Sequence, residues 1–185
     1  MKAFKRDHLL FSLCGLNCGL CPMHLDHYCP GCGGGEGNQS CAIARCSLHH
    51  GGLEYCYLCD EYPCEKYADI ELFDSFVTHR NQIKDLEKAK NIGIDAYLIE
   101  LTEKMEILNY LLDNYNDGRR KSFFCIAVNL LELQDVKAVV EQIETETKSA
   151  DHTPKEKATL ATALLNAMAE EQNIVLKLNK KTSKK

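Results

Sequence analysis

The sequence lacks the features of a membrane-spanning or nucleic-acid-binding chain. No apolar run in its 185 residues approaches the roughly 18–20 residues that a membrane span needs. Lysine and arginine number 22 against 27 aspartates and glutamates, which gives a net charge of -5. Nucleic-acid-binding domains usually carry a basic surface instead. We therefore expect neither a membrane nor a nucleic acid as a partner.

We expect no targeting signal at the N-terminus. Basic residues precede the apolar run Leu9–Phe11, but this run is too short for a signal peptide and no small-x-small cleavage site follows it. Leu13 is too bulky to precede a lipoprotein cysteine at Cys14. We therefore expect a cytoplasmic protein, in which thiols stay reduced. In that compartment a cysteine-dense sequence favours metal binding or catalysis over disulfides.

Cysteine is what the chain has in abundance. Two residues between cysteines let one turn present both sulfurs to one metal ion, and three pairs have this spacing: Cys18/Cys21, Cys29/Cys32 and Cys56/Cys59. Apolar residues are too sparse between Cys14 and Gly52 to build a core, so we expect little regular structure there and a backbone held by metal. The ten predicted metal ligands are Cys14, Cys18, Cys21, Cys29, Cys32, Cys41, Cys46, Cys56, Cys59 and Cys64.

The spacing does not determine how these ligands divide into sites. One partition joins Cys18, Cys21, Cys29 and Cys32 in one site, and Cys41, Cys46, Cys56 and Cys59 in another. Cys14 and Cys64 then remain, and they can form a third site with His24, His27, His49 or His50. Interleaved partitions fit equally well. The prediction is the ligand set and two or three metal ions, without a pairing.

Zinc is the predicted metal. It prefers four tetrahedral thiolate or imidazole ligands, and the number of cysteines, their tight turns and the nearby histidines suit it. The spacing Cys14-x3-Cys18-x2-Cys21 also matches the four-iron cluster motif of radical S-adenosylmethionine enzymes. Those enzymes need a large α/β barrel, and the alternating strand–helix pattern of such a barrel is absent. A ferredoxin-like iron–sulfur cluster is the alternative, since its ligands are also thiolates.

The rest of the chain predicts helices. Apolar residues recur at three- and four-residue spacing from Pro63 to Val77, which places His79 on a surface helix, and then in the following segments: 83–92, 95–115, 119–131 and 135–143. Thr153-Pro154-Lys155-Glu156 has the layout of a capping box and opens a last helix. Residues 174–178 alternate as one short strand would.

Together these patterns predict a mainly α fold. An irregular cysteine-rich zinc-knuckle module, residues 10–66, packs on a domain of about five to six helices, residues 67–178, with at most one or two short strands. Residues 179–185 form a disordered basic tail. Cys125 lies among apolar residues and is predicted to be a buried structural cysteine. The cations of Asp117–Ser122 stand at a helix start, where the dipole disfavours them; this suggests an anion site or a solvated turn with paired charges.

Four cysteine motifs carry a family resemblance. They are Cys-Gly-Leu-Asn-Cys-Gly-Leu-Cys-Pro from Cys14, Cys-Pro-Gly-Cys from Cys29, Cys-Ala-Ile-Ala-Arg-Cys from Cys41, and Glu-Tyr-Cys-Tyr-Leu-Cys-Asp-Glu-Tyr-Pro-Cys-Glu-Lys from Glu54. With them the chain resembles the prokaryotic family catalogued as domain of unknown function 3795, over Cys14 to about Lys66 and weakly to Leu131. The resemblance implies zinc binding and no particular substrate. Longer members often have a further cysteine shortly before the position of Cys41, where this chain has Gly37–Ser40.

The predicted function follows from the ligand number. Four thiolates on each ion leave no open position for water or substrate, so the zinc is structural and no catalytic residue is predicted. We then expect a protein-interaction or scaffolding module with a protein partner of unknown identity. An iron–sulfur redox or sensor protein is the alternative. A hydrolytic zinc enzyme needs a site with three protein ligands, which Cys14 and Cys64 with a histidine can supply, but no carboxylate is placed as its base.

Overall fold

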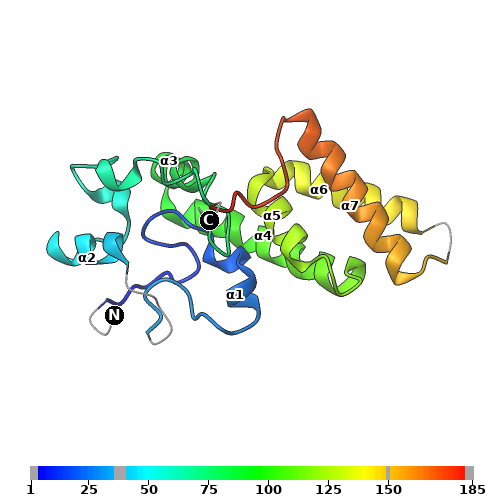
Figure 1. The fold of residues 1–185 in the computed structure, drawn as a ribbon, viewed down its shortest axis with the longest axis horizontal. Coiled ribbons are helices and arrows are strands. Elements are labelled where there is room, and N and C mark those ends of the chain that lie inside the picture. Colours follow the sequence, from blue (N-terminus) through cyan, green and yellow to red (C-terminus); the bar gives the residue numbers. More distant parts are fainter. Residues whose placement is uncertain (1–3, 36–40, 149–150, 182–185) are drawn as a thin grey trace. The chain divides into compact units, whose positions relative to one another are not determined.

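The fold is mainly α, as predicted. A computed structural model describes residues 4–35, 41–148 and 151–181 (Figure 1). Over these ranges it contains seven α-helices, three short 3-10 helices and no sheet; an isolated antiparallel bridge joins Phe11 to Asn17. The chain forms two compact units, Met1–Leu101 with Leu178–Lys185, and Thr102–Lys177. The predicted module boundary at residue 66 falls inside the first unit.

The first unit begins with short elements joined by loops. They are η1 (Cys18–Leu20), α1 (Pro22–Leu25), α2 (Ala42–His49), η2 (Cys56–Leu58) and η3 (Glu65–Tyr67), followed by α3 (Gln82–Ile92). Helix α2 is an element that the sequence analysis did not predict. It buries Ala44 and Ser47, three residues apart, on one face, and that spacing was the signal for it.

A buried polar network joins the cysteine segment to α3 and to the start of α4 (Ile94–Tyr115). The Asn17 side-chain amide donates to Asp85 Oδ2 at 2.8 Å, and the Tyr97 hydroxyl donates to Asn17 Oδ1 at 2.9 Å. The Phe11 ring lies 4.5 Å from the Tyr97 ring, between centroids. These contacts fix the segment that carries Cys14 and Cys18 on two regular helices.

Gly15 makes a close backbone approach to α3. Its φ is +95°, in the left-handed region that favours glycine. A Cβ atom at this position would lie 2.2 Å from the carbonyl oxygen of Gln82. The residue after Cys14 therefore has to be glycine for the turn to pack on the helix.

The helices downstream of residue 82 follow the prediction. Helix α3 ends at Gly93, whose φ is +89°, and α4 ends at Tyr115 before the Asn-Asp-Gly turn. None of the described helices is both long and apolar enough to cross a membrane.

The second unit contains α5 (Lys121–Leu130), α6 (Leu133–Thr147), α7 (Pro154–Glu171) and most of α4. Every residue of α5 from Phe124 to Leu130 is buried, so this helix is central as predicted. The buried Lys104 ammonium donates to the carbonyl oxygen of Leu131 at 2.7 Å, just beyond the end of α5. The predicted capping box of α7 is present: Glu156 N donates to Thr153 Oγ1, and Thr153 N donates to the Glu156 carboxylate.

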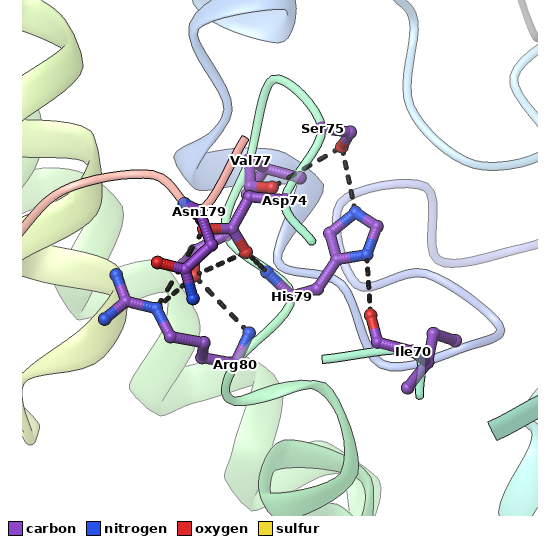
Figure 2. A network of polar contacts seen from close by, with 8 residues as sticks. Ile70, Asp74, Ser75, Val77, His79, Arg80 and Asn179 are labelled. Carbon is purple, nitrogen blue, oxygen red and sulfur yellow. Dashed lines mark hydrogen bonds and ion pairs between the residues drawn. The ribbon is translucent and has the colours of Figure 1, made fainter. Parts of the chain in front are cut away.

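The helix predicted up to Val77 is wrong. Residues 68–80 form turns and bends instead. The Asp74 carboxylate accepts hydrogen bonds from His79 N at 2.7 Å and Thr78 Oγ1 at 3.3 Å, a local arrangement that competes with helical bonding (Figure 2). His79 is therefore on a loop, where its ring contacts Ser75 Oγ at 2.9 Å and Ile70 O at 3.2 Å.

The C-terminal segment from residue 174 to residue 181 has no regular secondary structure. Residues 174–178 form no strand in the structure. Asn179 is hydrogen-bonded to Asp74, and the Lys181 ammonium lies 5.4 Å from the centre of the Phe73 ring. The rest of the predicted basic tail, residues 182–185, lies outside the described residues.

Candidate metal centre

Four of the predicted ligands surround one cavity. It has a volume of about 30 Å³, and the residues that line it include Cys46, Cys56, Cys59, Cys64 and His50. A space of this size accommodates one water-sized species. Apolar side chains, among them Leu13 and Leu53, complete the wall.

Local backbone contacts place these four cysteines at the lining of the cavity. Cys59 N donates to the Cys56 carbonyl at 3.0 Å, which closes the turn η2 between them. Cys56 N donates to Leu13 O at 2.9 Å and so ties this turn to the N-terminal segment. Cys64 is the residue that precedes η3. Cys46 lies on α2, whose Ser47 hydroxyl donates to Leu53 O at 2.7 Å and holds the connecting loop.

The side chains of His50 and Tyr67 contact thiols of this group and can influence their pKa. His50 Nδ1 lies 3.7 Å from Cys46 Sγ and 2.9 Å from the Cys46 carbonyl oxygen, and its Nε2 lies 3.8 Å from Glu61 Oε1. Burial raises the pKa of Cys56 to about 12, and a hydrogen bond from the Tyr67 hydroxyl opposes that rise only in part. The charges of neighbouring thiolates raise it further. A positive ion would reverse this balance, since thiolates are stabilised by nearby cations.

The other six predicted ligands lie outside the lining of this cavity. Burial raises the pKa of Cys14 to about 11. Hydrogen bonds from the Ser12 hydroxyl, at 3.2 Å, and from the Leu16 amide lower this pKa in part. Burial also raises the pKa of Cys21, and hydrogen bonds from the amides of Met23 and His24 to its sulfur lower this pKa in part. Such N–H and O–H donors are the outer partners that stabilise and orient thiolate ligands.

The guanidinium of Arg6 is a cationic partner of Cys32. Burial raises the pKa of Cys32, while the guanidinium of Arg6 and the amide of Leu13 lower it in part. The Arg6 side chain is only 1% exposed and lies 3.0 Å from Glu54 Oε1. Cys41, at the start of α2, is the one exposed member of the ten.

The structure places Cys64, rather than Cys41, at the cavity with Cys46, Cys56 and Cys59. The charge of Cys41 instead raises the pKa of Cys14 and of Cys32. None of the eleven cysteines forms a disulfide. Within the described ranges, no three Cys, His, Asp or Glu side chains lie close enough together to hold a metal ion as they stand.

Of the four histidines considered as ligands, His50 lines the cavity. His24 Nδ1 lies 3.1 Å from the Cys29 carbonyl oxygen, which is an outer contact, whereas His27 and His49 are exposed. The sequence analysis missed Ser12, Arg6 and Tyr67 as partners of thiols. Arg6 and Tyr67 act through tertiary contacts, which spacing does not signal. Ser12 lies two residues before Cys14, and this proximity was the available signal for its role.

Two further predictions concern the second unit. Cys125 is buried, as predicted, at 3% exposure. In the Asp117–Ser122 segment, Asp117 accepts a hydrogen bond from Arg119 N at 3.0 Å and lies 3.7 Å from Arg120 Nε. These contacts favour the turn with paired charges over the anion site.

The chain was compared with family models, curated proteins and solved structures. No family model, no curated protein and no solved structure matches it.

Proposed function

We propose that this chain is a zinc-binding protein in which structural multi-cysteine zinc sites support a protein-interaction or scaffolding module. The observation that carries the proposal is the gathering of Cys46, Cys56, Cys59 and Cys64 around one cavity. Four thiols are the ligand set of a structural zinc site. The resemblance to domain of unknown function 3795 agrees with it and is itself part of the proposal.

The donor set around the cavity fits zinc in kind and number. Cys46, Cys56, Cys59 and Cys64 would hold one ion, whose charge stabilises the thiolates. His50 and Tyr67 would orient Cys46 and Cys56 by hydrogen bonds, as outer partners of metal ligands do. Since no three of these side chains meet at one point as they stand, zinc would draw them inward, and binding would be coupled to ordering of the module. Metal ligation requires reduced thiols, which suits the cytoplasm.

The interaction role has support in the loop between η3 and α3. Leu72, Phe73 and Phe76 are 55%, 41% and 65% exposed, although they lie close together in the sequence. Clustered exposed apolar side chains are typical of surfaces that contact another protein. With four thiolates on each zinc, no site is open to water, so the metal would act through the fold and not through catalysis.

Elemental analysis with a visible absorption spectrum tests the proposal, on untagged protein purified without oxygen. We expect about two or three zinc ions per chain and no colour. The variants Cys59→Ser and Cys125→Ser form a matched pair: the first should lose zinc, and the second should keep it. Iron with acid-labile sulfide and absorbance near 400 nm (approximate, as for thiolate-bound clusters) would overturn the zinc assignment in favour of an iron–sulfur protein.

A further inference from the structure

A serine and a histidine lie in hydrogen-bond contact on the loop between η3 and α3. The Oγ atom of the exposed Ser75 is 2.9 Å from Nε2 of His79, and Nδ1 of His79 is 3.2 Å from the carbonyl oxygen of Ile70 (Figure 2). The imidazole ring thus stands between a hydroxyl and a backbone acceptor. Neither Ser75 nor His79 is a predicted metal ligand, so the pair has no role in the proposed zinc sites.

The backbone contact determines which ring nitrogen carries the proton. A carbonyl oxygen only accepts hydrogen bonds, so Nδ1 of His79 donates to Ile70 O. Nε2 of the neutral imidazole then has a free lone pair, and the Ser75 hydroxyl donates to it. The other acceptor near this hydroxyl, Val77 O, is farther away at 3.4 Å. A nucleophile, a base and a group that orients the base are therefore arranged in sequence.

The loop that carries the pair is fixed by the Asp74 carboxylate. This buried side chain accepts hydrogen bonds from His79 N and from Asn179 N, both at 2.7 Å. Ser75 N donates to Val77 O at 3.2 Å. One carboxylate thus places the backbone on both sides of the pair. Such positioning matters for a catalytic pair, because a displacement of about 1 Å can cost a large part of the rate.

Phe76, the residue after the serine, supplies two further features of a reactive site. Its amide donates no hydrogen bond among the residues that the structure describes. In serine hydrolases the amide at this position often stabilises the oxyanion of the intermediate. The side chains of Phe76 and Leu72 are 65% and 55% exposed. Exposed apolar surface for an acyl group is therefore present on the same loop.

We propose that Ser75 and His79 form a nucleophile–base pair that hydrolyses carboxylic esters with an apolar acyl group. Ser75 Oγ bonds to the ester carbonyl carbon while its proton passes to His79 Nε2. The bond from that carbon to the alcohol oxygen then breaks, and Nε2 gives the proton to the departing alcohol. Water next attacks the acyl group and gives a proton to Nε2, and Oγ regains that proton as the acid leaves. The site uses none of the cysteines, so it goes beyond the proposed zinc-binding role.

Covalent labelling of the full chain with a fluorophosphonate tests the nucleophile. An activated serine oxygen bonds to the phosphorus of this probe and displaces fluoride, and peptide mass spectrometry locates the adduct. We expect the adduct on Ser75 and none on Ser122, an exposed serine in the first turn of α5. Ser75→Ala should abolish labelling, and the matched control Ser122→Ala should leave it unchanged. An unlabelled Ser75, or equal labelling of the two serines, would overturn the proposal.

Hydrolysis of p-nitrophenyl butyrate gives a second readout of the nucleophile. The rate that remains in Ser75→Ala measures the reaction of the ester with the eleven free cysteines. We expect the unchanged chain to hydrolyse the ester faster than this background. Equal rates for the unchanged chain and for Ser75→Ala would contradict esterase activity at this serine.

Replacement of His79 by glutamine tests the base. General-base assistance contributes about 10²–10⁴-fold to a rate, so His79→Gln should slow the labelling of Ser75 by at least about 100-fold. Labelling at the rate of the unchanged chain would show that His79 is not the base. Where His79→Gln fails to fold, ¹⁵N NMR of the unchanged chain decides the question. We expect a proton on Nδ1 and none on Nε2, and a proton on Nε2 would leave Ser75 without a base and overturn the proposal.

Discussion

Two hydrogen bonds that involve backbone groups join Asp74 and Asn179. Asp74 N donates to Asn179 O at 2.7 Å, and Asn179 N donates to Asp74 Oδ2 at 2.7 Å (Figure 2). The Asp74 side chain is fully buried, and its other oxygen accepts from His79 N at 2.7 Å. One carboxylate thus organises the loop between η3 and α3 and fixes the C-terminal segment against it.

Replacing Asp74 by alanine should lower the free energy of unfolding by about 3 kcal/mol, since several donors lose a buried charged acceptor at once. Urea unfolding measures that change. Hydrogen exchange should also show the Asn179 amide losing its protection. Ser75→Ala is the matched control, because Ser75 contacts the exposed side of the His79 ring; it should cost less than about 1 kcal/mol. Unchanged protection of Asn179 in the alanine variant would contradict the role of Asp74.

The turn after Cys14 should not tolerate a side chain. In Gly15→Ala the new Cβ would lie 2.2 Å from the Gln82 carbonyl oxygen, and the residue would keep a φ of +95°. We expect destabilisation above about 3 kcal/mol, because both strain and backbone overlap must be relieved. Thermal unfolding checks this. Gly51→Ala is the control: its φ is +83°, but no atom lies within 4 Å of the added Cβ, so only about 1 kcal/mol should be lost.

The Asn17 network should be sensitive to removal of one hydroxyl. Tyr97→Phe deletes the donor to Asn17 Oδ1 and should lower the free energy of unfolding by about 1–2 kcal/mol. Burial raises the pKa of Tyr97 well above its usual value, and the charge of Asp85 raises it further, so the hydroxyl stays protonated as a donor. Tyr28→Phe, at a side chain that is 72% exposed, should change stability by less than about 0.5 kcal/mol. Equal effects of the two substitutions would contradict the network's contribution.

The elements that could be predicted from sequence are those with long, regular patterns. Apolar residues recur over the whole length of helix α4. The capping box of Thr153 and Glu156 indicates where α7 begins. The segment around Phe73 and Phe76 has the spacing of a helix too. It does not form a helix, because the His79 amide donates its hydrogen bond to the Asp74 side chain. In a helix this amide would donate to a backbone carbonyl instead.

For the cysteines, too, the sequence predicts some features, and others depend on tertiary contacts. Their spacing predicts the metal ligands as a set, but Cys46 and Cys64 belong to no Cys-x2-Cys pair. The place of these two at the cavity with Cys56 and Cys59 depends on α2 and η3. The contacts of Arg6 with Cys32 and of Tyr67 with Cys56 join residues whose association depends on the folded chain. Spacing carries no information about such tertiary contacts.

The capping box of α7 should have a measurable pH signature. Hydrogen bonds from the backbone and side chain of Thr153 lower the pKa of Glu156 below its ordinary value. A lowered pKa in the folded state contributes stability above the unfolded pKa, and this contribution is lost as the pH falls through the folded pKa. NMR titration of the Glu156 carboxyl should therefore give a pKa below the ordinary value of a glutamate. Thr153→Ala should return it to the ordinary range, and an unchanged value in that variant would contradict the cause.

Removing the proposed zinc should affect the two units differently. The second unit has an extensive apolar core that includes Phe124, Val128, Leu131, Val136 and Leu165, so it should keep its helices without metal. The cysteine segment has the small cluster of Phe4, Leu13 and Ala44, and it would rely on bonds to metal for order. Hydrogen exchange with and without a chelator, read by mass spectrometry, should show residues 14–35 and 41–64 losing protection while α5 to α7 keep theirs. Protection of these two ranges that survives proven loss of metal would contradict a structural role for zinc, because the backbone would then be held by its own contacts.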